Sequence, residues 1–206
     1  MKLRLSRTDI FTSLMCFFGM LPGIVFYKSM PDRIPIHWNI NNQPDNYAAK
    51  AFVVFAIPAL MFVMQLICCA FAFNRENEKV PKNAQFVCRL IIPTITIILE
   101  TITVMWALEI YKNVGSVALC IVGVIMIVLG NYMPKTRRNT VFGIKLPSTL
   151  KSDEAWRKTH RLAGYLMVFA GTASVIFALL TLYIPAIILI TCAVIIPVVY
   201  SLTIDQ

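Results

Sequence analysis

Long apolar runs dominate this chain and constrain its fold more than any other feature. Six segments of about 20 residues each are apolar enough to cross the roughly 30 Å hydrocarbon layer of a membrane as helices. They lie at about 9–28, 50–73, 86–110, 114–133, 162–181 and 184–203. Because they use most of the 206 residues, we predict one all-α integral membrane domain over 1–206, without a separate soluble domain.

Basic residues in the connections between these runs predict the orientation. The chain has 19 Lys and Arg against 10 Asp and Glu, but topology and anionic lipid headgroups explain this excess better than direct nucleic-acid binding. With a cytoplasmic N-terminus, only four basic residues fall outside, namely Lys28, Arg33, Lys50 and Lys112. We therefore predict that both termini are cytoplasmic. The first apolar run lacks a convincing small-residue cleavage site, so we interpret it as a retained span.

Residues that bind metals or perform catalysis are few and badly placed for either task. The six cysteines lie in or beside apolar runs without a metal-type Cys-x-x-Cys pair, so we expect no disulfide framework or zinc site. The two histidines, His37 and His160, fall on opposite sides of the membrane in this topology. Asp32 and Asp45 could join His37 as ligands, although no motif requires it. We predict no metal, no cofactor and no catalytic site; an intramembrane enzyme is the weakest alternative.

The external connection, residues 29–49, contains the polar stretch RIPIHWNINNQPDNYAAK. Its apolar and polar residues alternate with the period of two that indicates an extended strand with one buried face. We expect one side to cover the outer helix ends, formed by Ile34, Ile36, Trp38 and Ile40. The other side should face solvent, formed by Pro35, His37, Asn39 and Asn41. A lone strand leaves backbone groups unpaired, so a second strand of the same loop or a partner must pair with it.

The internal connection, residues 134–161, begins as an irregular segment and ends in a helix. Ser152 is a good N-cap, with acidic residues after it in the first turn. Trp156 and His160 follow four residues apart, beside a parallel basic row of Arg157 and Arg161. Trp and Arg at this depth suggest an interfacial anchor. The helix can continue through Gly164 into the fifth span.

The external stretch resembles the outer motif of the SdpI-type membrane proteins. That family's pattern is roughly Pro-x-x-Ile-Pro-x-His-aromatic-Asn, a short turn, Pro-Asp-x-aromatic, then Lys. The matching residues are Pro31, Ile34, Pro35, His37, Trp38, Asn39, Pro44, Asp45, Tyr47 and Lys50. The family usually has Gly in the turn, whereas this chain has Asn42 and Asn46. Asn tolerates the left-handed region, so we expect the turn to be retained.

The internal connection is similar to the inner motif of the same family. Its pattern is Asn-x-x-Phe-Gly-Ile-basic-x-Pro, then Thr-Leu, then Trp-basic-x-Thr-His-Arg. The matching residues are Asn139, Phe142, Gly143, Ile144, Lys145, Pro147, Thr149, Leu150, Trp156, Arg157, Thr159, His160 and Arg161. Ser148 stands where the family often has Trp, so one anchoring aromatic residue is missing.

This resemblance implies a non-enzymatic immunity or receptor protein of the bacterial plasma membrane. A secreted toxin peptide would meet the outer loop and be sequestered there or kept from the bilayer. The toxin-facing residues would be Pro35, His37, Trp38, Asn39, Pro44, Asp45 and Tyr47. The family also implies a cytoplasmic transcriptional repressor as partner of the inner motif. Read from the residues alone, the inner segment is a basic, lipid-facing, topology-setting loop.

Charged residues inside the third span leave a second hypothesis open. Arg89 and Glu100 share a helix face, but they lie about 16 Å apart along the axis and cannot pair directly. Glu100 is therefore protonated, faces a polar interior or pairs with another helix. Intramembrane charges often mark a function. The alternative to an immunity protein is thus a small transporter or permeation protein that uses Glu100.

Overall fold

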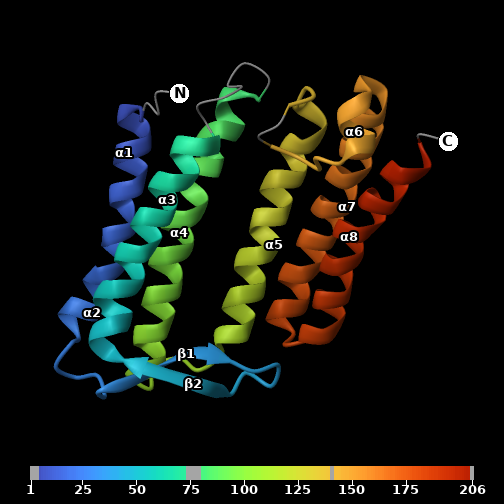
Figure 1. Ribbon diagram of the computed structural model, residues 1–206. Helices are drawn as coiled ribbons and strands as arrows, with labels where there is room; N and C mark the ends of the chain where they lie inside the picture. Colours follow the sequence, from blue (N-terminus) through green and yellow to red (C-terminus); the bar gives the residue numbers. More distant parts are fainter. Residues whose placement is uncertain (1–4, 73–79, 140–141, 205–206) are drawn as a thin grey trace. The chain divides into compact units, whose positions relative to one another are not determined.

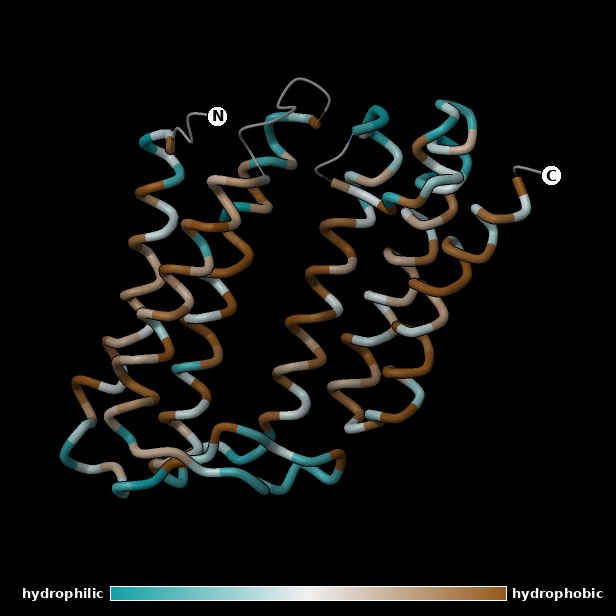
Figure 2. The backbone as a smooth tube through the Cα atoms, viewed as in Figure 1, coloured by the Kyte–Doolittle hydropathy of each residue, from teal (hydrophilic) through white to brown (hydrophobic). Residues whose placement is uncertain are grey.

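A computed structural model describes residues 5–72, 80–139 and 142–204, and these residues include six helices long and apolar enough to cross a membrane. The predicted all-α membrane class is therefore confirmed, with one small sheet added (Figure 1). Apolar residues line the helices and hydrophilic residues gather at their ends (Figure 2). The spans are Arg7–Val25, Phe52–Phe71, Lys82–Ala107, Val114–Lys135, Asp153–Leu179 and Tyr183–Thr203. The cytoplasmic placement of the termini stays a prediction.

The chain divides into two compact units. The first comprises Met1–Asn74 and Val87–Ala118, and the second comprises Arg75–Phe86 and Leu119–Gln206. Elements of the first unit are α1 (Arg7–Leu14), the 3₁₀ segment η1 (Met15–Gly19), α2 (Met20–Val25), β1 (Arg33–Trp38), β2 (Pro44–Ala49), the π-helical segment η2 (Phe52–Ala56), α3 (Ile57–Ala72) and most of α4 (Lys82–Ala107). Those of the second are most of α5 (Val114–Tyr132), the 3₁₀ segment η4 (Met133–Lys135), α6 (Pro147–Lys151), α7 (Asp153–Leu179) and α8 (Tyr183–Thr203).

The first span begins with a capping box at Ser6. The Ser6 hydroxyl accepts a hydrogen bond from the backbone N–H of Asp9, and the Asp9 carboxylate accepts one from the backbone N–H of Ser6. This exchange satisfies N–H groups that a helix start leaves unpaired.

Further along the first span, Gly23 lies so close to Val54 that an added β-carbon would clash with the valine side chain. A small residue there lets the first and second spans approach closely.

The connection predicted to be external, residues 29–49, forms a two-stranded antiparallel hairpin of β1 and β2. Of the two ways to pair the predicted strand, the second strand from the same loop is therefore the correct one. Ile34 is fully buried and packs in an apolar cluster with Met30, Val53, Val54 and Val104. This cluster anchors the base of the hairpin on the helices of the first unit.

In the second unit, glycines bring α5 and α7 into close contact. A β-carbon on Gly123 would lie 2.7 Å from the Gly171 carbonyl oxygen, and one on Gly164 would lie 2.8 Å from that of Gly130. The two glycines of α5 are seven residues apart, and so are the two glycines of α7. Both contacts therefore fall on one face of each helix. The helix α7 continues through Gly164 as predicted, and it begins at Asp153, earlier than the expected span boundary.

Candidate functional site

The turn of the hairpin is built by two asparagines. Asn39 accepts hydrogen bonds through Oδ1 from the backbone N–H groups of Asn41 and Gln43, at 2.9 and 3.1 Å. Asn42 adopts the left-handed region with φ of 59°. This confirms the expectation that Asn can take the place of the family's Gly in the turn. Its side chain also donates to the Lys112 carbonyl and accepts from the Gly115 N–H, at 2.9 and 2.7 Å. The turn is therefore fixed to the connection after α4 and to the first turn of α5, whereas Asn46 lies in β2 instead.

Lys50 closes the base of the hairpin. Its Nζ lies 3.2 Å from Asp32 Oδ1, donates to the Met30 carbonyl and sits 5.0 Å from the centre of the Tyr27 ring. Because Asp32 pairs with Lys50, it is not a partner of His37. Among the described residues, no group of three His, Cys, Asp or Glu side chains lies close enough to hold a metal ion.

His37 and Asp45 face each other across the hairpin at its exposed surface. His37 Nδ1 lies 2.5 Å from Asp45 Oδ1, and their side chains are 66% and 44% exposed. Tyr47 on β2 is also exposed. The hairpin thus presents an imidazole, a carboxylate and a phenol to solvent on a framework held at both its base and its turn. We call His37, Asp45 and Tyr47 the polar face.

The expected strict alternation along β1 is wrong beyond its first residues. Pro35 is buried, whereas Ile36 and Ile40 are 39% and 55% exposed. The physical reason is the irregular pairing of the strands, whose register shifts between Pro35 and His37 and again before Trp38. Pro35 therefore packs inside instead of facing solvent.

The remaining outer motif residues support the hairpin from within. Trp38 is half-buried and meets the Trp106 ring edge-on, with centroids 6.4 Å apart. Its buried indole N–H has no hydrogen-bond partner among the described residues. Pro44 is half-buried and opens β2 opposite Trp38. Of the predicted toxin-facing residues, Pro35, Trp38, Asn39 and Pro44 thus shape the hairpin, and the polar face presents the rest.

The inner motif is organised around the fully buried His160. Its Nδ1 lies 2.8 Å from the Trp156 carbonyl oxygen, and its Nε2 accepts the Ile144 backbone N–H at 3.0 Å. Because Nε2 accepts, the proton of a neutral ring must be on Nδ1, which donates to the carbonyl. The Trp156 and His160 rings stack with centroids 3.8 Å apart. The ring therefore fastens the loop to α7.

Gly143 and Asn139 shape the loop that meets this histidine. Gly143 has φ of +121°, and a β-carbon there would overlap His160 Nε2, so no other residue fits without a shift. Asn139 is buried; it accepts from the Phe142 N–H at 2.7 Å and donates to the Arg137 carbonyl at 2.8 Å. Both motif positions are explained by backbone geometry.

Trp156 is not the interfacial anchor that its position suggested. It is 2% exposed, and its indole N–H donates to the Thr136 carbonyl at 2.9 Å. The loop after α5 covers the ring, which the sequence spacing alone could not indicate. Arg157 and Arg161 on the same helix are exposed, and Arg161 lies 5.9 Å from the Tyr165 ring centre. The basic row thus stays at the surface while its aromatic neighbour is buried.

Other inner residues divide in the same way. Thr149 is buried and donates to the Ile144 carbonyl at 2.7 Å, and Ser148 meets Ser201 of α8 at 3.1 Å. Ser148 therefore makes a buried polar contact where the family often has an aromatic residue. The N-cap predicted at Ser152 is confirmed. Lys145 and Pro147 are exposed, and Phe142 is half-buried.

Arg89 in the third span is paired with Asp9, a residue that the sequence reading missed. Arg89 Nε donates to Asp9 Oδ1 at 2.6 Å, with both side chains nearly buried. Gln65 on α3 donates to the Arg89 carbonyl at 2.7 Å. The sequence signal for Asp9 was its position three residues after Ser6, which is the spacing of a capping box. That signal indicates a helix start, but it does not reveal the pairing with Arg89.

Glu100 is buried without an ion pair among the described residues. It is 4% exposed, lies beside Gly19 and has one carboxyl oxygen, Oε2, without a hydrogen-bond partner there. Of the alternatives for this residue, a partner on another helix is thus not found in the described part of the chain.

Comparisons with known proteins agree with both motifs. The SdpI/YfhL protein family matches residues 135–201, and a domain of unknown function (DUF1648) matches residues 14–62. The chain is 25% identical over 165 residues to Immunity protein SdpI of Bacillus subtilis (strain 168), covering 80% of this chain and 78% of the relative. No solved structure matches the chain. The resemblance to the SdpI-type family is confirmed, and with the six spans it indicates a multi-pass protein of the bacterial plasma membrane.

Proposed function

We propose that this relative of the SdpI immunity protein is itself a non-enzymatic immunity protein, which protects a bacterium from a secreted toxin peptide. The similarity over four fifths of the chain supports an immunity role. We assign toxin recognition to the hairpin because its His37–Asp45 pair is exposed. The hairpin that holds this pair is fixed at its turn by Asn42 and at its base by Lys50. Polar groups exposed on a rigid support are suited to recognition, because little ordering is lost on binding.

The hairpin offers the toxin peptide three kinds of contact. The polar face can hydrogen-bond to peptide groups, and the exposed Ile36 and Ile40 can cover apolar side chains. A two-stranded sheet also has open edges, to which an extended peptide can add as a further strand. A peptide bound in this way is sequestered at the membrane surface before it enters the bilayer.

On the other side, the same chain would report the peptide to a cytoplasmic transcriptional repressor. The exposed Arg157 and Arg161 and the exposed Lys145 form a basic surface for such a partner. The buried part of the inner motif would hold this surface in place. This signalling role is secondary to the immunity role and can be absent without affecting it.

Survival of a toxin-sensitive bacterium tests the immunity role. We expect the wild-type chain to protect, and the variant His37→Ala/Asp45→Ala/Tyr47→Ala to lose protection at an unchanged level in the membrane. The matched control is Asn41→Ala/Gln43→Ala, which removes two exposed turn side chains outside the motif. Full protection by the triple variant would contradict the proposal.

A second candidate function, proton or solute permeation, is favoured by one observation. Glu100 is a buried carboxyl group with an oxygen unpartnered among the described residues, in a span where such groups are costly. A Glu100→Gln variant keeps the size and polarity of the side chain but cannot ionise. Loss of a measured flux in this variant, with protection from toxin retained, would favour permeation; unchanged flux would count against it.

A further inference from the structure

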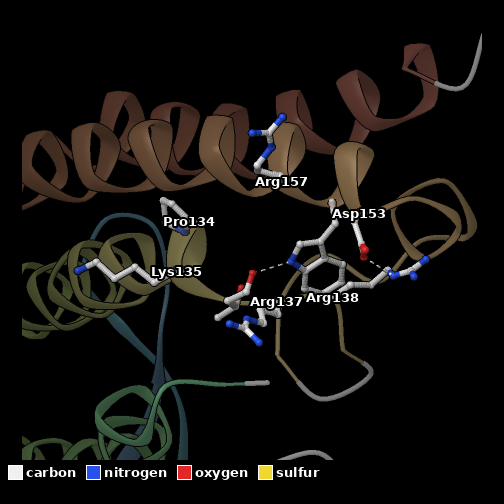
Figure 3. Close-up of a pocket in the computed structure, with 8 residues that line it drawn as sticks. Pro134, Lys135, Arg137, Arg138, Asp153 and Arg157 are labelled. Carbon is white, nitrogen blue, oxygen red and sulfur yellow. Dashed lines mark hydrogen bonds and ion pairs between the residues drawn. The ribbon is translucent and has the colours of Figure 1, made fainter. Parts of the chain in front are cut away.

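A basic pocket lies between the segment that follows α5 and the first turns of α7. Its volume is about 580 Å³, and its lining residues are Pro134, Lys135, Thr136, Arg137, Arg138, Asp153, Trp156 and Arg157. Four of these residues are basic and one is acidic. Figure 3 shows Arg157 on α7 and Arg137 on the segment opposite. The pocket therefore favours an anionic ligand.

One of the four basic groups is already engaged with the protein, and a second is partly engaged. Arg138 pairs with Asp153 at 2.8 Å and donates to the Leu150 carbonyl, also at 2.8 Å. The one acidic residue of the lining is thereby neutralised. Lys135 lies 3.5 Å from Asn131 Oδ1 and 5.6 Å from the Tyr132 ring centre, both weak interactions at such distances.

The guanidinium groups of Arg137 and Arg157 have no hydrogen bond or ion pair among the described residues, and both side chains are exposed. A guanidinium group presents a planar fork of N–H donors that matches two oxygens of a phosphate group. Arg137 and Arg157 line one pocket from two segments, and their guanidinium groups point away from each other in Figure 3, so both flexible side chains must turn inward to hold one phosphate. The engaged Arg138 contributes positive charge close to them.

The surface next to the pocket is suited to acyl chains. At 100° per residue, one sector of α7 about 100° wide contains Arg157, Arg161, Tyr165, Val168, Ile176 and Leu179. Its apolar members are exposed, with Tyr165 at 64% and Leu179 at 75%. The helix thus runs from basic residues at the pocket into an exposed apolar stripe within a predicted span. A phospholipid has the same order of parts: a charged phosphate followed by hydrocarbon.

We infer that the pocket binds the phosphate group of an anionic phospholipid, with Arg137 and Arg157 as its ligands and the apolar stripe of α7 along the acyl chains. Basic pockets at the ends of spanning helices commonly bind such headgroups. Charge alone would also attract an acidic protein, but the exposed stripe of α7, which is apolar apart from Thr172, favours a lipid. The inference does not depend on the proposed immunity function, because the pocket and the hairpin share no residues.

Lipid binding to the purified full-length chain tests this inference. The delipidated protein in neutral detergent is titrated separately with phosphatidylglycerol, phosphatidylcholine, inorganic phosphate and a soluble polyglutamate peptide. Bound lipid is counted by native mass spectrometry. We expect phosphatidylglycerol to bind in preference to all three alternatives. Equal binding of phosphatidylcholine, or binding of phosphate or polyglutamate without a preference for the anionic lipid, would overturn the assignment.

Charge-matched variants locate the site. Arg137→Gln/Arg157→Gln should weaken phosphatidylglycerol binding about tenfold or more, because both phosphate ligands are lost. The control Arg7→Gln/Lys28→Gln removes two exposed positive charges outside the pocket and should leave binding unchanged. An equal loss in both variants would overturn the inference. If the pocket variant folds poorly, Arg137→Lys/Arg157→Lys retains the charges without the forks and should still bind measurably more weakly than wild type; unchanged affinity would overturn the inference too.

Discussion

The outer hairpin and the inner motif both centre on a histidine, but the two histidines have opposite surroundings. The side chain of His37 is 66% exposed and pairs with an exposed carboxylate, whereas His160 is fully buried and hydrogen-bonds to two backbone groups. An exposed pair contributes little to stability, while removing a buried partner leaves polar groups unsatisfied. The difference indicates that the inner histidine maintains the fold and the outer one is available for binding.

His160→Ala is the substitution with the largest expected effect. It leaves the Ile144 N–H without its partner, removes the side-chain bond to the Trp156 carbonyl and removes a ring stacked on Trp156. We expect the free energy of unfolding to fall by about 3 kcal/mol. Thermal unfolding of the purified protein in detergent measures this. His160→Gln, which can donate and accept, should recover part of the loss; a His160→Ala protein as stable as wild type would show that the contrast is wrong.

Gly143→Ala should have the next largest effect. The substitution adds a β-carbon that overlaps His160 Nε2 and places a non-glycine residue at a φ of +121°. We expect a loss of about 2 kcal/mol in unfolding free energy. In the His160→Ala background, Gly143→Ala should cost less unfolding free energy, because the His160 ring that the added β-carbon overlaps is absent. Fully additive losses would mean that the two residues act independently.

Asn42→Ala tests how firmly the outer hairpin is held. It removes the bonds to Lys112 and Gly115 and places alanine in the left-handed region, so we expect about 1.5 kcal/mol of destabilisation. Asn42→Gly restores the backbone freedom but not the bonds and should lose less. Melting temperatures of the two purified variants check this order. The reverse order would contradict the assignment of the turn.

His37→Ala should have the smallest effect on stability. Because the His37–Asp45 pair is exposed, we expect a change below about 0.5 kcal/mol in unfolding free energy. The same thermal measurement checks it beside His160→Ala. A loss as large as that of the buried histidine would remove the distinction between the two motifs.

The spans and the existence of the outer strand were predictable because they depend on local patterns. Runs of apolar residues report helices of membrane length, and the period of two reports a strand. Side-chain burial was less predictable, since it depends on what another segment covers. The segment after α5 covers Trp156, and its Thr136 carbonyl accepts the indole N–H. Pro35 faces inward because the strand register shifts next to it. Asp9 was missed because its partner, Arg89, lies 80 residues away in sequence.

The most direct test of the central claim is binding of the toxin peptide to the purified chain. We expect His37→Ala/Asp45→Ala to weaken binding about tenfold or more while the melting temperature stays within a few degrees of wild type. The turn control Asn41→Ala/Gln43→Ala should bind as wild type does. Unchanged affinity of the His37/Asp45 variant would contradict recognition by the hairpin.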